Sequence, residues 1–453
     1  MTPPAVPVAP SALARQIGLG SASLLVVGGI IGSGIFFTPA EVARALGSSN
    51  AILAAWIIGG VVALAGALTY AELGAMLPDA GGAYVYIREA FGPLAAFLCG
   101  WMVLASIASG AIAAVAMGFA GYAERYLSLA PVGGRLGLAA LTIALLTMTN
   151  VLGVKPGVVM QNTLTIAKSA ALFGLIGLGL LLWNAAPNAA APALPLSAPP
   201  PPPLLRGAAS AFVAVLFTVG GWQQMNMVAG EIKDPQRTIP RALLIGISIV
   251  IAIYLGANVV YLHELGRDGL ATSAAVAADT ATRLIGPRGA QAITLAAMLS
   301  ILGFTGVALL TNARVLFALG EDGAFLQAAA RVHPRWGSPH VALLLLGGWS
   351  LILLFATQGR IGDLLSGVVF ADWIFFGLGA ASVFVLRHTR PDAVRPYRVP
   401  WYPVLPAFFV MAAAVGVVSA FLASLTTSML GTALLALGAV VYLVVARRQQ
   451  GRA

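Results

Sequence analysis

Charge is scarce in this sequence. Only 9% of its 453 residues are Asp, Glu, Lys or Arg, and 59% are hydrophobic. A soluble globular chain carries about 25% charged residues, so this chain has too little charge to cover a water-facing surface. Apolar runs of roughly 20 residues recur along its length, each long enough to cross a hydrocarbon layer of about 30 Å as a helix. The sequence therefore predicts an all-α polytopic membrane protein.

Cysteine and closely spaced histidines are also scarce. Cys99 is the only cysteine, which excludes an internal disulfide, and the four histidines lie far apart, at His263, His333, His340 and His388. This spacing does not suit a metal site, and we expect neither a metal nor another cofactor. The net charge of +10 comes from basic residues scattered between apolar segments, which argues against a nucleic-acid partner.

Twelve membrane-spanning helices are expected in a lipid bilayer. With the N-terminus in the cytoplasm, most Lys and Arg residues outside the spans fall on the inner side, which places both termini in the cytoplasm of a cell (inner) membrane. Residues 1–18 lead directly into a span, and no cleavable signal is expected. The expected spans are residues 19–45, 50–76, 92–122, 135–153, 158–183, 208–231, 240–262, 289–319, 340–357, 362–387, 402–424 and 429–447.

A proline-rich segment divides these spans into two halves. Residues 199–203 are consecutive prolines, which predicts an extended external loop at residues 184–206. We expect, in order, a cytoplasmic tail (1–18), a first five-helix repeat (19–183), the external loop (184–206), a second five-helix repeat (207–387), and helices 11 and 12 with a cytoplasmic tail (388–453).

Glycines interrupt two of the spans at mid-membrane depth. The first span contains Gly28, Gly29, Gly32 and Gly34, and the sixth contains adjacent glycines at residues 220–221. A glycine inside a helix costs roughly 1 kcal/mol relative to alanine. Close helix packing through small residues is one explanation. Two breaks at corresponding places in two halves instead indicate discontinuous helices around a transport site, because freed backbone at this depth must line a cavity or be buried in protein.

Such a pair of broken helices suits a zwitterionic ligand. The N-terminus of a half-helix carries unpaired N–H groups and about half a positive charge, so it can bind a carboxylate. Unwound carbonyls and helix C-terminal ends can accept hydrogen bonds from an ammonium group. An α-amino acid presents both groups a few bonds apart, and the sequence therefore predicts an amino acid site.

Seven short motifs occur in order along the chain. They are residues 29–36 (GIIGSGIF), 70–73 (YAEL), 78–86 (PDAGGAYVY), 91–93 (FGP), 220–222 (GGW), 231–241 (EIKDPQRTIPR) and 395–400 (RPYRVP). They resemble motifs of the amino acid-polyamine-organocation transporter superfamily, most closely the L-type amino acid transporter light chains and their bacterial relatives. The resemblance implies a LeuT-like core of five plus five inverted helices, broken helices 1 and 6, two extra C-terminal helices, and transport by alternating access.

The resemblance also implies roles for residues at the two breaks. It assigns the substrate carboxylate to backbone amides and the substrate amine to backbone carbonyls, with an aromatic gate over both. The amides are those of Gly32, Ser33 and Gly34, the carbonyls those of Ile30, Phe217 and Gly220, and the gate is Phe217. Gln223, which follows the second break, is a further candidate substrate-binding residue. Phe217 could instead be an ordinary apolar residue that faces lipid or the core.

Lys168 lies within the fifth span, among apolar residues. A charge at this depth costs at least ~2.5–3.5 kcal/mol, which favours a functional role. By the resemblance, its ammonium occupies the place of sodium in sodium-coupled relatives and bridges span one to span eight, with Thr305 or nearby backbone as partner. A fixed cationic strut and a proton carrier remain alternative roles.

Asp372 departs from the pattern of the resemblance, in which an uncharged amide is common at this position in span ten. If it faces the pocket, it favours a substrate with a cationic side chain. If it faces a neighbouring helix, it is a structural group. We favour the structural group, and we keep Asp372 among the candidate substrate-binding residues. Near inner span ends, Arg314 is expected to extend to the cytoplasm, and Glu72 and Glu231 are expected to form ion pairs in an inner gate.

These observations predict a secondary active transporter of L-amino acids with neutral side chains, acting as an exchanger or a proton-coupled permease. A cationic amino acid or polyamine transporter is the alternative. A membrane enzyme is not expected, because no nucleophile, metal ligands or paired carboxylates converge at one depth, and a channel would need a ring of pore-lining groups. Animal light chains join a heavy subunit through an external cysteine after span three. The segment 124–134 has no cysteine, so no disulfide-linked heavy subunit is expected.

Overall fold

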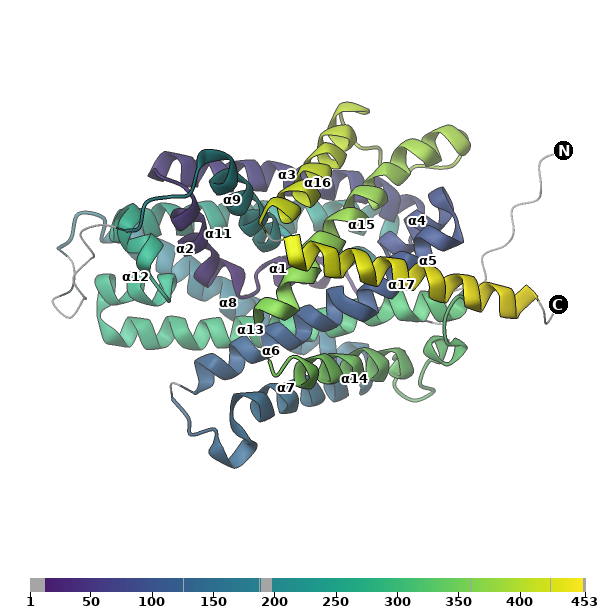
Figure 1. The fold of residues 1–453 in the computed structure, drawn as a ribbon, viewed down its shortest axis with the longest axis horizontal. Coiled ribbons are helices and arrows are strands. Elements are labelled where there is room, and N and C mark those ends of the chain that lie inside the picture. The colour runs from purple at the N-terminus through teal and green to yellow at the C-terminus, as the bar shows by residue number, and fades with distance from the viewer. Residues whose placement is uncertain are drawn as a thin grey trace.

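The structure is a computed structural model that describes residues 13–124, 126–186, 188, 198–359, 361–423 and 425–450. These residues form helices that pack into one bundle (Figure 1). The elements are α1 (Leu19–Ile30), α2 (Gly34–Ala45), α3 (Ser49–Met76), α4 (Ala83–Phe91), α5 (Pro93–Met102), η1 (Val103–Ile107), α6 (Ala108–Ala123), η2 (Ala130–Val132), α7 (Gly134–Val151), α8 (Val154–Leu181), α9 (Leu204–Val219), α10 (Gln224–Met227), η3 (Ala229–Glu231), α11 (Pro235–Thr272), α12 (Val276–Ile285), α13 (Pro287–Glu321), η4 (Gln327–Ala330), α14 (His340–Ala356), α15 (Ile361–Thr389), α16 (Val404–Ala423) and α17 (Leu425–Gln450).

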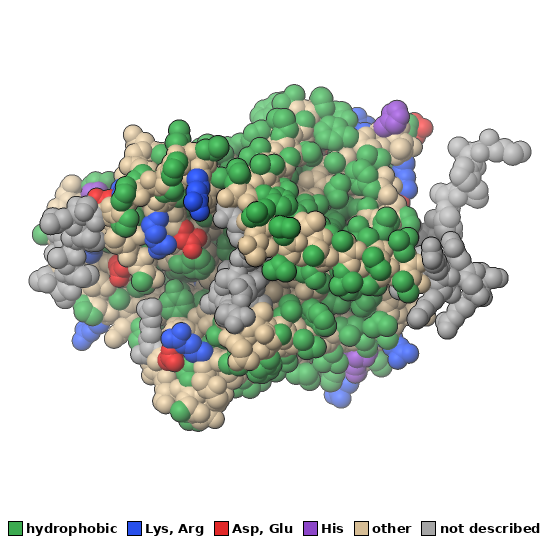
Figure 2. Space-filling model, viewed as in Figure 1, with side chains coloured by type: hydrophobic (Ala, Val, Ile, Leu, Met, Phe, Trp, Pro, Cys, Tyr) green, Lys and Arg blue, Asp and Glu red, His purple; other side chains and the backbone are tan. Residues whose placement is uncertain are grey.

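Long apolar helices dominate the bundle. Within the described ranges, nine helical segments are long and apolar enough to cross a membrane. Three shorter apolar helices, Leu204–Val219, His340–Ala356 and Ser428–Val444, overlap the expected spans six, nine and twelve. Figure 2 shows a face that is largely hydrophobic, with charged side chains gathered toward its two ends. The protein is therefore a multi-pass membrane protein, and the total of twelve spans remains a prediction.

The two interrupted helices lie inside the bundle. α1 packs against α8, α11 and α13, and most of its residues are buried. α2 packs against α9 and α11, and the short α10 packs against α1 and α13. The backbone on either side of both glycine breaks is thus enclosed by protein rather than lipid, which is the condition for unpaired backbone groups at this depth.

Several boundaries differ from those expected. α11 extends from Pro235 to Thr272 with a kink at Gly266 (φ 63°), and it is longer than the expected span because it continues beyond the apolar run. α4 and α12 are additional short helices between spans. α9 begins at Leu204, within the expected external loop of residues 184–206, and residues 187 and 189–197 of that loop lie outside the described residues. Residues 1–12 of the expected tail also lie outside them.

Candidate functional site

The two glycine breaks contact each other. α1 ends at Ile30 and α2 begins at Gly34, while α9 ends at Val219 and α10 begins at Gln224. A Cβ atom on Gly221 would lie 2.1 Å from the carbonyl oxygen of Gly29, and a Cβ on Gly29 would lie 2.8 Å from the Gly221 carbonyl oxygen. Gly221 also has a φ of 101°. Glycine is required here because both backbones approach more closely than any side chain permits.

Helices around the first break bind most of its carbonyl groups. The Lys168 ammonium on α8 donates to the carbonyl oxygen of Gly28 at 3.0 Å and to that of Ile31. The Ser300 hydroxyl on α13 donates to the Gly32 carbonyl oxygen at 2.8 Å. The Ile30 carbonyl oxygen accepts from the Tyr254 hydroxyl at 3.1 Å and from the Gly32 amide at 2.8 Å. The Ile30 carbonyl and the Gly32 amide, both expected to bind substrate, are therefore already paired in this conformation.

Other backbone groups at the breaks have no partner among the described residues. The amides of Ser33 and Gly34, at the N-terminus of α2, donate no hydrogen bond there. The carbonyls of Phe217 and Gly220, at the C-terminal end of α9, accept none. Gln223 stabilises the second break, since its Oε1 accepts from the Gly221 amide at 3.0 Å. Two free donors and two free acceptors thus remain at facing helix ends.

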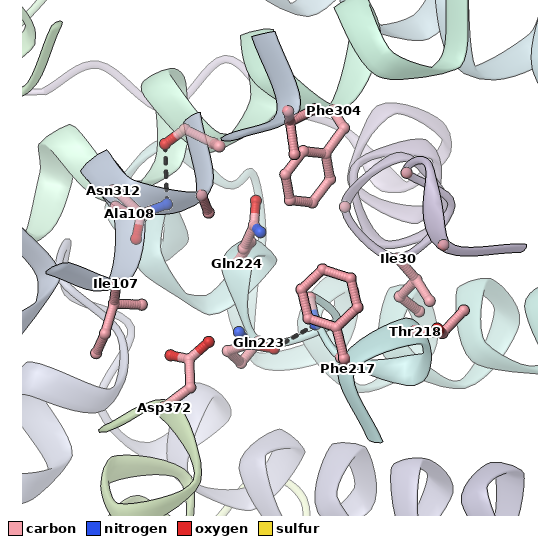
Figure 3. Close-up of a pocket in the computed structure, with 18 of the residues that line it drawn as sticks. Ile30, Ile107, Ala108, Phe217, Thr218, Gln223, Gln224, Phe304, Asn312 and Asp372 are labelled. Carbon is pink, nitrogen blue, oxygen red and sulfur yellow. Dashed lines mark hydrogen bonds between the residues drawn. The ribbon is translucent and has the colours of Figure 1, made fainter. Parts of the chain in front are cut away.

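These groups line one pocket (Figure 3). Eight residues expected at a substrate site all line it: Ile30, Gly32, Ser33, Gly34, Phe217, Gly220, Gln223 and Asp372. Sequence reasoning missed further lining residues, among them Phe304, Asn312, Gln224, Ile107 and Trp373. Phe304 packs on the first break, since a Cβ on Gly32 would lie 3.2 Å from its ring.

Lys168 and Thr305 lie outside this pocket lining. Lys168 is fully buried behind the first break, where it contacts span one as expected. The expected contact with Thr305 is not formed: the Thr305 hydroxyl donates to the carbonyl of Ile301 in its own helix, at 2.9 Å. Ser300 takes the bridging place between α13 and α1. Ser300 and Tyr254 were missed, although a polar group within an apolar span is itself a signal of a specific role.

Asp372 faces the pocket, as its place among the candidate substrate-binding residues requires, and does not face only a neighbouring helix, which was the interpretation that we favoured. Its side chain on α15 is only partly buried and belongs to the pocket wall. Figure 3 shows its carboxylate pointing into the space between Ile107 and Gln223. The apolar sequence around it gives no indication of which face of the helix is turned inward.

Ion pairs and the N-terminal segment close one end of the pocket, the end expected to face the cytoplasm. Arg314 follows the lining residue Asn312 by two residues, and Glu231 follows the lining residue Met227 by four. Arg314 Nε lies 2.6 Å from Glu231 Oε1, and both side chains are 1% exposed. Arg314 therefore does not extend into the cytoplasm, because a buried carboxylate binds it. The Ile17 amide donates to the Glu231 carbonyl at 2.9 Å, which ties the N-terminal segment to this pair.

A second contact at this end joins α4 to the end of α13. Arg88 Nη1 lies 2.6 Å from Asp322 Oδ2, and the Tyr84 hydroxyl donates to the same oxygen at 2.6 Å. Burial and this hydrogen bond raise the pKa of the Tyr84 hydroxyl above its ordinary value, so Tyr84 remains a neutral donor.

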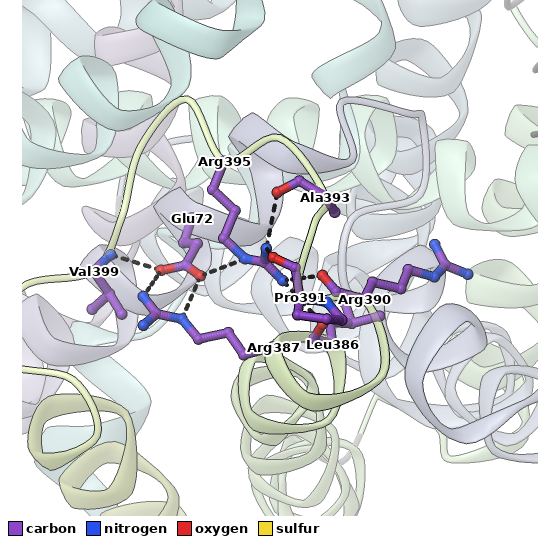
Figure 4. Close-up of polar contacts among 8 residues, drawn as sticks. All are labelled: Glu72, Leu386, Arg387, Arg390, Pro391, Ala393, Arg395 and Val399. Atoms are coloured by element: carbon purple, nitrogen blue, oxygen red, sulfur yellow. Dashed lines mark hydrogen bonds and ion pairs between the residues drawn. The ribbon is translucent and has the colours of Figure 1, made fainter.

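Glu72 fastens α3 to the end of α15 (Figure 4). Its carboxylate accepts from Arg387 Nε at 2.9 Å and Nη2 at 2.7 Å, and from the Val399 amide at 2.7 Å. Arg395 lies 3.5 Å from the same carboxylate and donates to the Leu386 carbonyl near the C-terminus of α15. The expected ion pairs of Glu72 and Glu231 are thus both formed.

The fold and the site together define a membrane protein with two broken helices around a mostly apolar pocket. A family model described as "Amino acid permease" matches residues 17–445. The chain belongs to this family, and thus to the amino acid-polyamine-organocation superfamily that its motifs resemble.

Similar proteins include several amino acid transporters. The chain is 31% identical over 409 residues to the "Serine/threonine exchanger SteT" of Bacillus subtilis, covering 88% of this chain and 91% of that protein. It is 32% identical over 413 residues to the "Large neutral amino acids transporter small subunit 2" of Mus musculus, covering 88% and 75%. It is 30% identical over 397 residues to the "b(0,+)-type amino acid transporter 1" of Mus musculus, covering 86% and 80%.

Proposed function

We propose that the protein is a secondary active transporter that carries L-amino acids across the cell membrane by alternating access. The observation that carries this proposal is that one pocket contains both unpaired amides, at Ser33 and Gly34, and unpaired carbonyls, at Phe217 and Gly220. The amides at the N-terminus of α2 bind the α-carboxylate, aided by the partial positive charge of the helix end. The carbonyls at the end of α9 accept hydrogen bonds from the α-ammonium.

The closed end of the pocket supports a cycle of alternating access. The Arg314–Glu231 pair and the contact of Ile17 with Glu231 close the end that we assign to the cytoplasm. Release to that side requires these contacts to open, with Phe217 as the gate on the substrate. Both termini lie in the cytoplasm in this proposal, and the core is a five plus five inverted repeat followed by two further helices.

Lys168 supports the first break during this cycle. It holds the carbonyls of Gly28 and Ile31, so it stabilises the geometry that leaves the Ser33 and Gly34 amides free. If Lys168 stays protonated and only supports the break, the protein is an exchanger. If Lys168 also releases a proton during the cycle, the protein is a proton-coupled permease. Dissipating an inward proton gradient separates the two, because only the permease slows.

Neutral amino acids are the first candidate substrates, because side chains such as Ile107, Phe304 and Trp373 make most of the wall apolar. A cationic amino acid or polyamine is the second candidate, favoured by Asp372 in the same wall. We propose that no disulfide-linked heavy subunit is needed, since the single cysteine, Cys99, is buried in α5.

Counterflow in liposomes tests the proposal. Purified protein is reconstituted, the liposomes are loaded with one of a panel of unlabelled amino acids, and initial uptake of labelled amino acid is measured. We expect saturable uptake that at least one internal amino acid accelerates. Uptake that does not saturate, or that no internal amino acid accelerates, would refute an alternating-access exchanger, and uptake without any response to a proton gradient would exclude the proton-coupled form.

A further inference from the structure

Asp372 is the only ionisable side chain among the described residues that line the pocket. The other polar side chains of the wall, including Gln223, Gln224 and Asn312, are neutral. No donor among the described residues forms a hydrogen bond with the Asp372 carboxylate. The pocket therefore contains a carboxylate without a partner.

The buried cations nearest to the breaks are already engaged elsewhere. Lys168 donates to the backbone behind the first break and does not line the pocket. Arg314 forms a two-point contact with Glu231, through Nε at 2.6 Å and Nη2 at 3.2 Å. An isolated carboxylate at membrane depth is costly unless a positive charge or a proton neutralises it. The missing charge has to enter the pocket from outside the protein.

The position of Asp372 suits the far end of an extended amino acid side chain. The free amides and carbonyls belong to α2 and α9, whereas Asp372 projects from α15, beside Ile107 at the end of the π-helical turn η1 (Figure 3). Ile107, Ala108, Trp373 and Phe376 provide an apolar wall around it. A ligand that fits this wall has an aliphatic stem with a cationic tip, and its α-groups remain at the two breaks.

We propose that Asp372 binds the cationic side-chain group of a basic L-amino acid of the lysine and ornithine type, which favours the second of the two candidate substrate classes over the neutral one. This inference rests on the proposed function, because it uses the same α-carboxylate and α-ammonium contacts. Asp372 is then the residue that determines substrate specificity. It distinguishes amino acids by the charge at the end of their side chain, whereas the two breaks bind the α-groups that all amino acids share.

A matched pair of ligands tests this assignment. L-lysine and L-norleucine have the same carbon chain and differ only in the terminal ammonium group. Binding of both is measured by competition with a labelled amino acid, in the wild type, in Asp372→Asn, and in the control Asp392→Asn, whose carboxylate lies on an exposed loop. A buried charge-assisted hydrogen bond corresponds to about a 10- to 100-fold change in affinity.

The wild type and Asp392→Asn should bind lysine at least about tenfold more tightly than norleucine. Asp372→Asn should lose this preference because its affinity for lysine falls by about tenfold or more. Equal binding of the two ligands by the wild type would overturn the inference whether or not the variant folds, and would leave the proposed function intact. A second result would also overturn the inference: norleucine uptake that depends on a proton gradient in the wild type but not in Asp372→Asn. Asp372 would then bind a proton instead of a cationic side chain. Binding of no amino acid at all would overturn the proposed function itself.

Discussion

Lys168 offers a quantitative test of the arrangement around the first break. Its ammonium supplies the hydrogen bonds to the carbonyls of Gly28 and Ile31, and it is fully buried. The substitution Lys168→Met keeps most of the stem and removes both donors. The Ile31 carbonyl keeps a hydrogen bond from the Ser300 hydroxyl at 3.3 Å, so only the Gly28 carbonyl is left unpaired, which costs about 1–3 kcal/mol. At 1.36 kcal/mol per factor of ten, the lower value shifts the break away from this geometry by about fivefold.

The loss should appear in transport more than in folding. Removing the ammonium also removes the cost of holding a charge within the membrane, which offsets part of the loss in stability. We expect Lys168→Met to insert and to unfold near the wild-type temperature, but to take up amino acid at least about fivefold more slowly at every pH, because transport passes through this geometry. Initial uptake in preloaded liposomes measures the rate. Ile166→Met, on the exposed face of the same helix, is the control. Wild-type uptake by Lys168→Met would refute the reasoning.

Other substitutions test the second break, the gate at Phe217 and the closed end of the pocket. Gly221→Ala should abolish uptake because its φ of 101° and an opposing carbonyl exclude a Cβ, whereas Gly118→Ala, which has open space, should be active. Phe217→Ala should slow uptake severalfold more than it weakens equilibrium binding, as expected for a lid; equal losses would argue against a gate. Arg314→Leu should destabilise the protein in thermal unfolding by about 3–5 kcal/mol by leaving Glu231 unpaired. Adding Glu231→Gln should restore most of this stability, and a lack of rescue would contradict the pairing.

The membrane spans and the two breaks could be predicted because their signals are local. A run of apolar residues long enough to cross the bilayer, or a pair of glycines within it, is visible without knowledge of its neighbours. The family motifs then placed Gly34, Phe217 and Gly220 in one site, and the structure has all three on one pocket wall.

The faces of the helices could not be predicted, because a helix that is hydrophobic on all sides has no preferred face. Thr305 and Ser300 illustrate this. Five residues apart at 3.6 residues per turn, they point about 140° apart, and only Ser300 reaches the first break. The orientation of Asp372 and the pairing of Arg314 with Glu231 depend in the same way on tertiary packing.

The most direct test of the account is an experimental structure of the protein with its transported amino acid bound. The account predicts that the α-carboxylate lies within hydrogen-bonding distance of the Ser33 and Gly34 amides and that the α-ammonium contacts the carbonyls of Phe217 and Gly220. An amino acid bound elsewhere at saturating concentration, or bound in this pocket without contact to either break, would contradict it.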